Sequence, residues 1–392
     1  MKYWRGYIAA ALFAALTVAL TSFSKAHSVL VDMIYPYVSR LIQTSLSGWV
    51  SSADFCLWQV LLVLLGVAGL ATVVLMIIFR WNFVQWLGWM LACVSLLSML
   101  HTGIYGLNQY AGPLADDVRL NALVDEETGN ALYLDSELVE TTAYLRDIAN
   151  ELSLAVARKT DGSVDFPEFS KLAEMAADGY DVLVYDKTYS VFAGATDPVK
   201  ELGWADMYSS MGITGMHVAF TGEAAVNPRT PAAALPFVMC REMAHRMCIA
   251  SDRDANLAAF LACDANPDPI FRYSGYFMAF RYCYHSLIAR NTSAAEAAAA
   301  QIYAGASDQL KLDLAAYDNF FDGAKDADLS GDEENIHGNI TDMMVSWYVQ
   351  EIYLPAHKEE DVTFDPENKG QIDLTTPDVV ITPTEEATEG ES

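Results

Sequence analysis

One stretch of the chain resembles a metal-binding motif in the types and spacing of its residues. Residues 240–263 read CREMAHRMCIASDRDANLAAFLAC. In an H-E-x-x-H motif, two His at positions i and i+4 bind zinc from one face of a helix, and the Glu beside the first activates a bound water. Here Glu242 and His245 occupy the positions of the general base and the second ligand, but Arg241 stands where the first ligand would be. Arg keeps its proton and has no lone pair for a metal.

A zinc site of this kind needs a third protein ligand, commonly a carboxylate further along the chain. Asp254 is the best-placed candidate, nine residues beyond His245. Zinc held by these two side chains alone would be bound weakly, so a complete set needs a replacement ligand. The candidates, in no preferred order, are His217, His285, Cys248 and Asp252.

This motif requires a helix to carry it and a strand to lie beside it. The pattern predicts a helix over residues 237–249 and, after a cap at Ser251 and Asp252, a second helix through Ala262. Upstream, residues 212–226 alternate around Gly and predict a strand and a turn. An edge strand at this position would pair with an extended peptide substrate. The residues expected to form it are Gly215, Met216, His217, Val218, Ala219 and Phe220.

Charge divides the chain into two parts. Up to Tyr110 there are five Lys or Arg and two Asp, a net charge of +3. The whole chain carries −28, which leaves −31 for residues 111–392, with 18 basic and 49 acidic residues. Such an acidic part repels nucleic acid and anionic lipid. We therefore expect no nucleic-acid partner.

Three apolar segments predict a transmembrane anchor over residues 1–105. The expected spans are residues 7–23, 55–79 and 83–100. The first segment could instead be a cleaved signal peptide, since Ser24 and Ala26 offer small residues at a cut site, but an uncleaved span is the preferred interpretation.

Residues 27–54 place aromatic and aliphatic side chains at helical spacing, which predicts an interfacial or re-entrant helix pair on the membrane face. We expect the N-terminus and the turn between the second and third spans to be cytoplasmic. Lys2, Arg5 and Arg80 then lie on the cytoplasmic side, while Lys25 and Arg40 lie on the extracellular side. We therefore expect a multi-pass cell-membrane protein in contact with the lipid bilayer, with its large C-terminal domain extracellular.

The remaining sequence predicts a domain over residues 111–374 and a disordered acidic tail over residues 375–392, which is rich in Thr, Pro, Glu and Gly. VLVY, within residues 181–192, suggests a short strand. Further helices are expected over residues 136–158, 166–177, 272–288, 293–306 and 310–321. The predicted fold class is α+β and mainly helical, with a three-helix transmembrane anchor and a small sheet.

The six Cys are too few for a disulfide scaffold. Cys56 and Cys93 lie in apolar runs and are interpreted as small hydrophobic residues. The other four, Cys240, Cys248, Cys263 and Cys283, allow three pairings that the sequence does not distinguish. A bond between the first two is excluded because they lie about 12 Å apart along one predicted helix. Buried free thiols are the preferred interpretation, and one disulfide is the alternative.

Several segments together resemble a bacterial membrane protein family known as domain of unknown function 3810, which is related to zincin-type zinc metallopeptidases. The matching segments are the three apolar spans, YGLNQY, GITGMHVAFTGEAAVN, LPFVMCREMAH, DANLAAFLAC and RYSGY. The resemblance implies an extracellular zincin-like domain in which Glu242 is the general base and His245 a zinc ligand. It places Asp254 where the family has a Glu as third ligand, and Arg241 where it has the first His.

Three functions are compatible with this pattern. The preferred hypothesis is a catalytically inactive binding or regulatory module, in which Arg241 pairs with Glu242 or Asp254 in place of zinc. The second is an active membrane-bound zinc metallopeptidase with a replacement ligand and a bound peptide substrate. The third is a structural envelope protein that packs against a partner protein.

Overall fold

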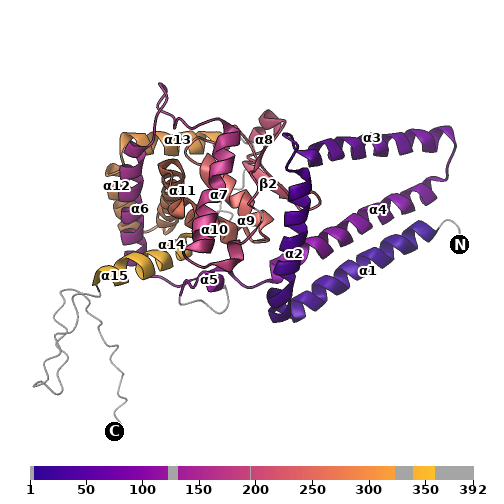
Figure 1. The fold of residues 1–392 in the computed structure, drawn as a ribbon, viewed down its shortest axis with the longest axis horizontal. Coiled ribbons are helices and arrows are strands. Elements are labelled where there is room, and N and C mark those ends of the chain that lie inside the picture. The colour runs from indigo at the N-terminus through magenta and orange to yellow at the C-terminus, as the bar shows by residue number, and fades with distance from the viewer. Residues whose placement is uncertain (1–3, 122–130, 195, 323–338, 358–392) are drawn as a thin grey trace, which may run out of the picture.

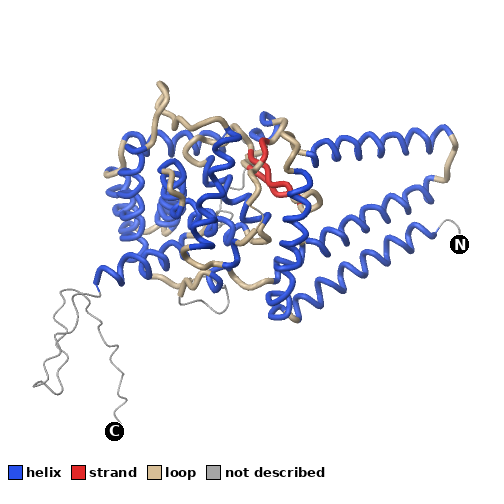
Figure 2. Tube along the Cα trace, viewed as in Figure 1, coloured by secondary structure: helices blue, strands red, loops and turns tan. Residues whose placement is uncertain are grey.

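A computed structural model describes residues 4–121, 131–194, 196–322 and 339–357. It is mainly helical with one three-stranded sheet, as expected (Figures 1 and 2). Three long helices extend to one side of a helical body, and a fourth stands between them and the body (Figure 1). The predicted tail over residues 375–392 lies outside the described residues.

Three of these helices are long and apolar enough to cross a membrane: α1 (Arg5–Ala26), α3 (Leu57–Ile78) and α4 (Phe83–Ile104). Their positions confirm the three predicted apolar spans. Helices α1 and α4 pack closely, since a Cβ atom on Gly6 would lie 2.5 Å from the carbonyl carbon of Gly88. Helix α3 diverges from α4 after their shared turn (Figure 1).

Between α1 and α3 lies α2 (Ser28–Val50), a single helix. The prediction of two helices in this region is therefore wrong, because the region contains one helix. Pro36 lies inside α2 without ending it.

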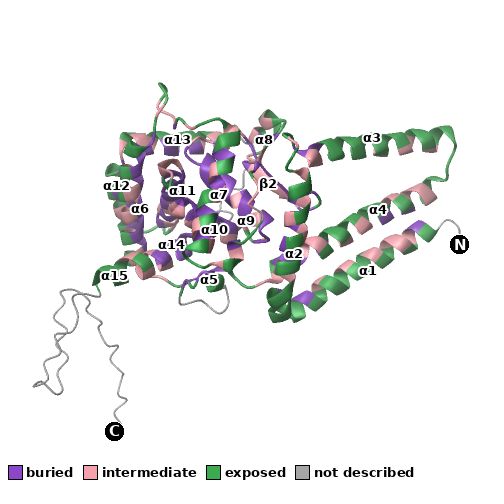
Figure 3. Cartoon of the chain, in the orientation of Figure 1, coloured by how far each residue is buried: buried purple, intermediate pink, exposed green. Residues whose placement is uncertain are grey.

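Helix α9 (Leu235–Arg246), which carries the metallopeptidase-like motif, packs against three neighbouring helices of the body: α7 (Phe169–Tyr185), α10 (Asp252–Ala265) and α11 (Pro269–Ala289). Helix α11 is the aromatic helix expected in the core, and most of its side chains are buried (Figure 3). Around these helices lie α6 (Asp135–Ala155), α12 (Ser293–Ala304), α13 (Asp308–Asp322) and α14 (Thr341–Tyr348). The short elements are α5 (Leu114–Asp117), α8 (Ala205–Ser210), α15 (Leu354–His357), η2 (Gly106–Tyr110), η3 (Ser190–Phe192) and η4 (Val349–Tyr353).

The strand expected from VLVY is wrong, because α7 continues through it to Tyr185. Tyr180 and Leu183 are buried on the same helical face as Leu172 and Ala176, so this face gains more from helical packing than from a strand.

The sheet has the order β1–β3–β2, with β1 (Lys200–Glu201), β3 (Glu223–Val226) and β2 (Gly215–Val218). Strand β3 is central and wholly buried, pairing parallel with β1 and antiparallel with β2. Strand β2 lies at the edge of the sheet and is half-buried. The predicted strand is therefore confirmed over its first four residues.

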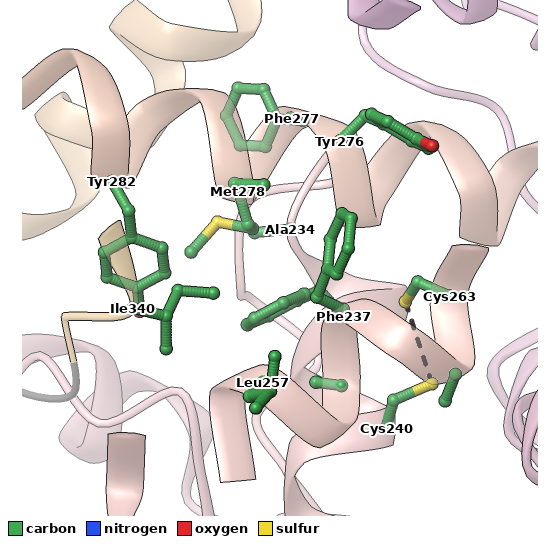
Figure 4. Close-up of a cluster of buried hydrophobic side chains, with 14 of the residues drawn as sticks. Ala234, Phe237, Cys240, Leu257, Cys263, Tyr276, Phe277, Met278, Tyr282 and Ile340 are labelled. Carbon is green, nitrogen blue, oxygen red and sulfur yellow. Dashed lines mark hydrogen bonds between the residues drawn. The ribbon is translucent and has the colours of Figure 1, made fainter. Parts of the chain in front are cut away.

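All six Cys are free thiols in the structure. Cys240 on α9 and Cys263 on α10 lie side by side inside the apolar cluster without forming a disulfide (Figure 4). Their Sγ atoms are 3.8 Å apart. Their contact helps to join the motif helix to the helix that follows it.

Candidate functional site

Helix α9 ends in a tight turn that sets the direction of the next helix. The Ile249 N–H donates to the Ala244 carbonyl, and the Cys248 N–H donates to the His245 carbonyl. This is the Schellman pattern, whose left-handed position usually holds Gly. Here the position is Cys248, with a φ of 73°. The turn brings the start of α10 back toward His245.

Arg241 and Glu242 form an ion pair on one side of α9. Arg241 donates from Nε and from a terminal nitrogen to Glu242 Oε1, at 3.0 and 2.6 Å, and also to Thr214 Oγ1 at 3.2 Å. The Glu242 side chain is almost wholly buried. Burial by itself lowers the pKa of Arg241, but the charge and hydrogen bonds of Glu242 outweigh it and raise that pKa. Arg241 thus holds the carboxylate of Glu242, the residue that we expected to act as general base.

Strand β2 lies directly over this pair. A Cβ atom at Gly215 would stand 2.7 Å from Glu242 Cγ and 2.8 Å from Glu242 Oε1. Only Gly therefore allows the strand to approach this closely.

A backbone carbonyl fixes the orientation of the His245 ring. Its Nδ1 lies 2.9 Å from the Ile249 carbonyl oxygen, which can only accept a hydrogen bond. Nε2 is therefore the ring atom left for a metal. It lies 3.2 Å from Asp252 Oδ1, so its nearest partner is a carboxylate.

Asp254, the expected third ligand, lies in the first turn of α10. Its backbone N–H donates to Ser251 Oγ, and its carboxylate lies beside the backbone of Leu114 in α5. Burial raises the pKa of this carboxyl group, with Arg253 opposing the shift. The carboxylate in contact with the His245 ring is that of Asp252, seven residues along the chain.

His217 on β2 also belongs to the site. Its Nε2 lies 3.2 Å from Gln43 Oε1 on α2, and its ring centroid lies 4.9 Å from that of Tyr105. Tyr105, in turn, donates to the His245 carbonyl at 3.0 Å. Burial and then the nearby His245 lower the pKa of His217 well below its ordinary value, so the ring is neutral at pH 7.

The other two candidate ligands lie elsewhere. Cys248 directs its thiol to Ser39 Oγ on α2, at 3.2 Å. His285 is on α11, where burial, followed by the charge of Arg281, lowers its pKa to about 4.

These residues do not fit a zinc ion. The carboxylate of Glu242 is hydrogen-bonded to Arg241. The carboxylate of Asp254 interacts with the backbone of Leu114 and not with His245. Within the described ranges, no three His, Cys, Asp or Glu side chains are grouped so that they could hold a metal.

The outer edge of β2 offers backbone groups. The Asn227 N–H donates to the Thr214 carbonyl, which makes this a hydrogen-bonded pair of the antiparallel ladder. By alternation Met216 and Val218 bond to β3, while the N–H and C=O groups of Gly215 and His217 point away from the sheet. In the described part of the chain, no strand pairs with this outer edge, which we call the free edge of β2.

Glu223, which sequence reasoning missed, links the sheet to α3, one of the candidate membrane-spanning helices. Its buried carboxylate accepts from the N–H groups of Leu57 and Trp58 at 2.8 and 2.9 Å, at the start of α3. Lys200 on β1 donates to it at 2.9 Å and to the Val50 carbonyl at 2.7 Å. The sequence signal was an acidic residue in the otherwise apolar strand EAAV, because a buried carboxylate requires hydrogen-bond or charged partners.

Taken together, the described residues include three candidate membrane-spanning helices and a mainly helical body, with an R-E-x-x-H helix under a short edge strand. The family described as protein of unknown function DUF3810 matches residues 31–342, which include all the site residues, and the chain belongs to that family. No curated protein and no solved structure matches it.

Proposed function

We propose that this protein is a membrane-anchored module that binds an extended segment of a partner protein at the free edge of β2 and does not hydrolyse it. The body is then a zincin-like domain that has exchanged catalysis for binding. The observation that carries the proposal is the ion pair between half-buried Arg241 and buried Glu242. A carboxylate that accepts two hydrogen bonds from a guanidinium is a poor base for activating water.

The binding half of the proposal rests on the free edge. Gly215 and His217 present backbone donors and acceptors in the pattern that an added strand uses. Beneath them Glu242 is neutralised by Arg241, and His217 is uncharged, so an incoming backbone meets no unpaired charge.

We place the body on the extracellular side. The N-terminal end of α1 and the turn between α3 and α4 both lie far from the body (Figure 1). Arg5 and Arg80 lie at these ends, and basic residues favour the cytoplasmic face.

Zinc content of the purified full-length chain tests the loss of catalysis. We expect less than about 0.1 zinc per chain by elemental mass spectrometry, because the ligand set is incomplete. Near-stoichiometric zinc, with hydrolysis of an unfolded substrate such as casein that stops on Glu242→Gln substitution, would show an active peptidase instead.

Photo-crosslinking tests the binding function. Phe220, two residues past β2 and 41% exposed, is replaced by p-benzoylphenylalanine in the full-length chain, with Leu154 on α6, 80% exposed, as the matched control. We expect Phe220 but not Leu154 to crosslink a protein in the native membrane. Equal yields at both positions would contradict binding at the β2 edge.

A further inference from the structure

Helix α2 has its polar side turned toward the protein and its apolar side turned outward. The inward stripe recurs every four residues and consists of Val31, Tyr35, Ser39, Gln43 and Ser47. The opposite stripe recurs at the same interval and includes Val29, Met33, Tyr37, Leu41 and Trp49, all more than 60% exposed. A helix on the surface of a water-soluble domain shows the reverse arrangement.

The polar groups of the inward stripe are used within the protein. Ser39 donates to the Ile104 carbonyl at 2.7 Å, Ser47 donates to Asp197 Oδ2 at 2.7 Å, and Gln43 donates to the Ala219 carbonyl at 3.2 Å. In the outward stripe the polar residue at the same spacing, Ser45, donates its hydroxyl to the Leu41 carbonyl of its own helix, and the large exposed side chains are aliphatic or aromatic.

Both ends of α2 lie next to membrane helices. Its first residue follows α1 after His27 alone, and its last residue, Val50, accepts a hydrogen bond from Lys200 beside the start of α3. It crosses the body-side ends of α1, α4 and α3 (Figure 1). This is the position and polarity of a helix in the plane of the bilayer surface, apolar face toward the acyl chains.

The candidate site is attached to the same boundary. Tyr105 is the first residue after α4, and it contacts both His245 and His217. The ring of His101, in the last turn of α4, lies 6.0 Å from that of Phe220, just beyond β2. The free edge of β2 is therefore within about 10 Å of the end of a membrane span.

We propose that α2 lies in the interfacial layer of the bilayer, and that the chain which adds to the free edge of β2 is a juxtamembrane segment of a membrane-anchored protein. This inference rests on the proposed binding function and names the class of its partner. An edge of four residues takes about 13 Å of extended chain. A segment leaving the bilayer reaches it with few intervening residues.

The chemistry of the site favours a polypeptide over a lipid headgroup. A phosphate would need unpaired cationic donors, but Arg241 is paired with Glu242 and His217 is neutral. The acidic body, with −31 over residues 111–392, also repels anionic lipid.

The depth of α2 is measured first, on the full-length chain in lipid nanodiscs. Nitroxide labels are attached to Leu41→Cys and, as a control, to Leu154→Cys, each in a Cys93→Ser background that removes the exposed native thiol. We expect the Leu41 label to collide with oxygen at least threefold more often than with a water-soluble nickel chelate, and the Leu154 label to show the opposite preference. A Leu41 label as accessible to the chelate as the Leu154 label would overturn the interfacial placement.

The partner class is read from the crosslinks formed at Phe220. Mass spectrometry locates the partner residue that is joined. We expect it within about ten residues of a membrane span or a lipid-modified residue of the partner, the distance that an extended chain covers in about 33 Å. Crosslinks concentrated in segments remote from any membrane attachment would refute the juxtamembrane class and leave the binding function standing. Absence of crosslinks above the Leu154 control would instead remove the binding function itself.

Discussion

At the scale of single residues, Arg241 supplies the positive charge that Glu242 faces. Glu242 is buried beneath Gly215, a position that admits no side chain, so a substitution at either residue acts on both α9 and β2. His245, by contrast, still has a ring nitrogen directed at a carboxylate rather than at Arg241. Glu242 and His245 thus have separate partners, Arg241 and Asp252.

Restoring the ligand tests which carboxylate belongs to the site. We expect Arg241→His to bind zinc, because His at positions i and i+4 share a helical face and Asp252 already contacts His245. Adding Asp252→Asn should lower the zinc content at least tenfold, whereas adding Asp254→Asn should leave it unchanged. Elemental analysis after dialysis measures this. If zinc were lost only when Asp254→Asn is added, the ligand would be Asp254 and not Asp252, which would contradict this prediction.

Protonation of His285 should make folding sensitive to acid. Burial lowers its pKa from an ordinary value of 6.5 to about 4, so its contribution is fully present above pH 6.5 and is lost as the pH falls toward 4. The limit is about 3 kcal/mol, reduced because the side chain keeps some solvent contact. We expect His285→Asn to flatten the dependence of the thermal midpoint on pH between 6.5 and 4. A slope equal to that of the wild type would show that this residue has no such role.

The sequence pattern could predict that Glu242 and His245 share a helix, because that depends only on helical spacing. It could not predict the Asp252 contact, which depends on the left-handed turn at Cys248. Nor could it bring His217 to Tyr105, since that requires both sheet pairing and the packing of α4.

At the scale of elements, the start of α3 is held by a strand of the sheet. The first N–H groups of a helix lack partners within it, and here two of them donate to Glu223. The positive end of the helix dipole and Lys200 both stabilise this buried carboxylate.

Removing that charge should loosen the junction. Glu223→Gln keeps the shape but weakens the hydrogen bonds from α3 and leaves Lys200 without its counter-charge, a cost of about 2 kcal/mol. We expect the thermal midpoint in detergent, followed by near-ultraviolet circular dichroism, to fall by about 5 °C. Glu201→Gln on the neighbouring strand, where the side chain is exposed, is the control and should change little. Similar midpoints for the two variants would argue against the junction.

Most helices were predictable from apolar periodicity, which decides the type of a long element. The exceptions have identifiable causes. VLVY is a strand pattern that became the last turn of α7, because tertiary burial outweighed local propensity. Residues 27–54 contain one helix, Ser28–Val50, and not two, because Pro36 lies inside that helix without ending it.

At the scale of the whole molecule, α2 and the candidate membrane-spanning helices make direct contacts with the body. Arg40 on α2 donates to the Met247 carbonyl at 3.1 Å and to the Ser190 carbonyl at 3.2 Å, so a membrane-proximal helix supports the end of α9. Tyr105 and Gln43 make further contacts across the same boundary.

A fragment comprising residues 111–357 should therefore fail to form the native site. It would lose the contacts of Arg40 and Tyr105 and leave Glu223 without the α3 donors. We expect size-exclusion chromatography and near-ultraviolet circular dichroism to show an expanded or aggregated fragment, in contrast to the full-length chain in detergent. A monomeric fragment with the thermal midpoint of the full chain would show that the body is independent of its anchor.

The divergence of α3 from α4 has a consequence for how the protein responds to its membrane. Glu223 ties the beginning of α3 to the sheet, and Tyr105 ties the end of α4 to α9. Strand β3, which pairs with β2, and helix α9 are thus each fastened to one arm of a hairpin whose other end is a short turn. Lateral pressure that pushed these arms together or apart at the bilayer surface would alter the separation of β2 from α9. Under the proposed binding function, lipid composition would then set how readily the free edge of β2 accepts an incoming strand.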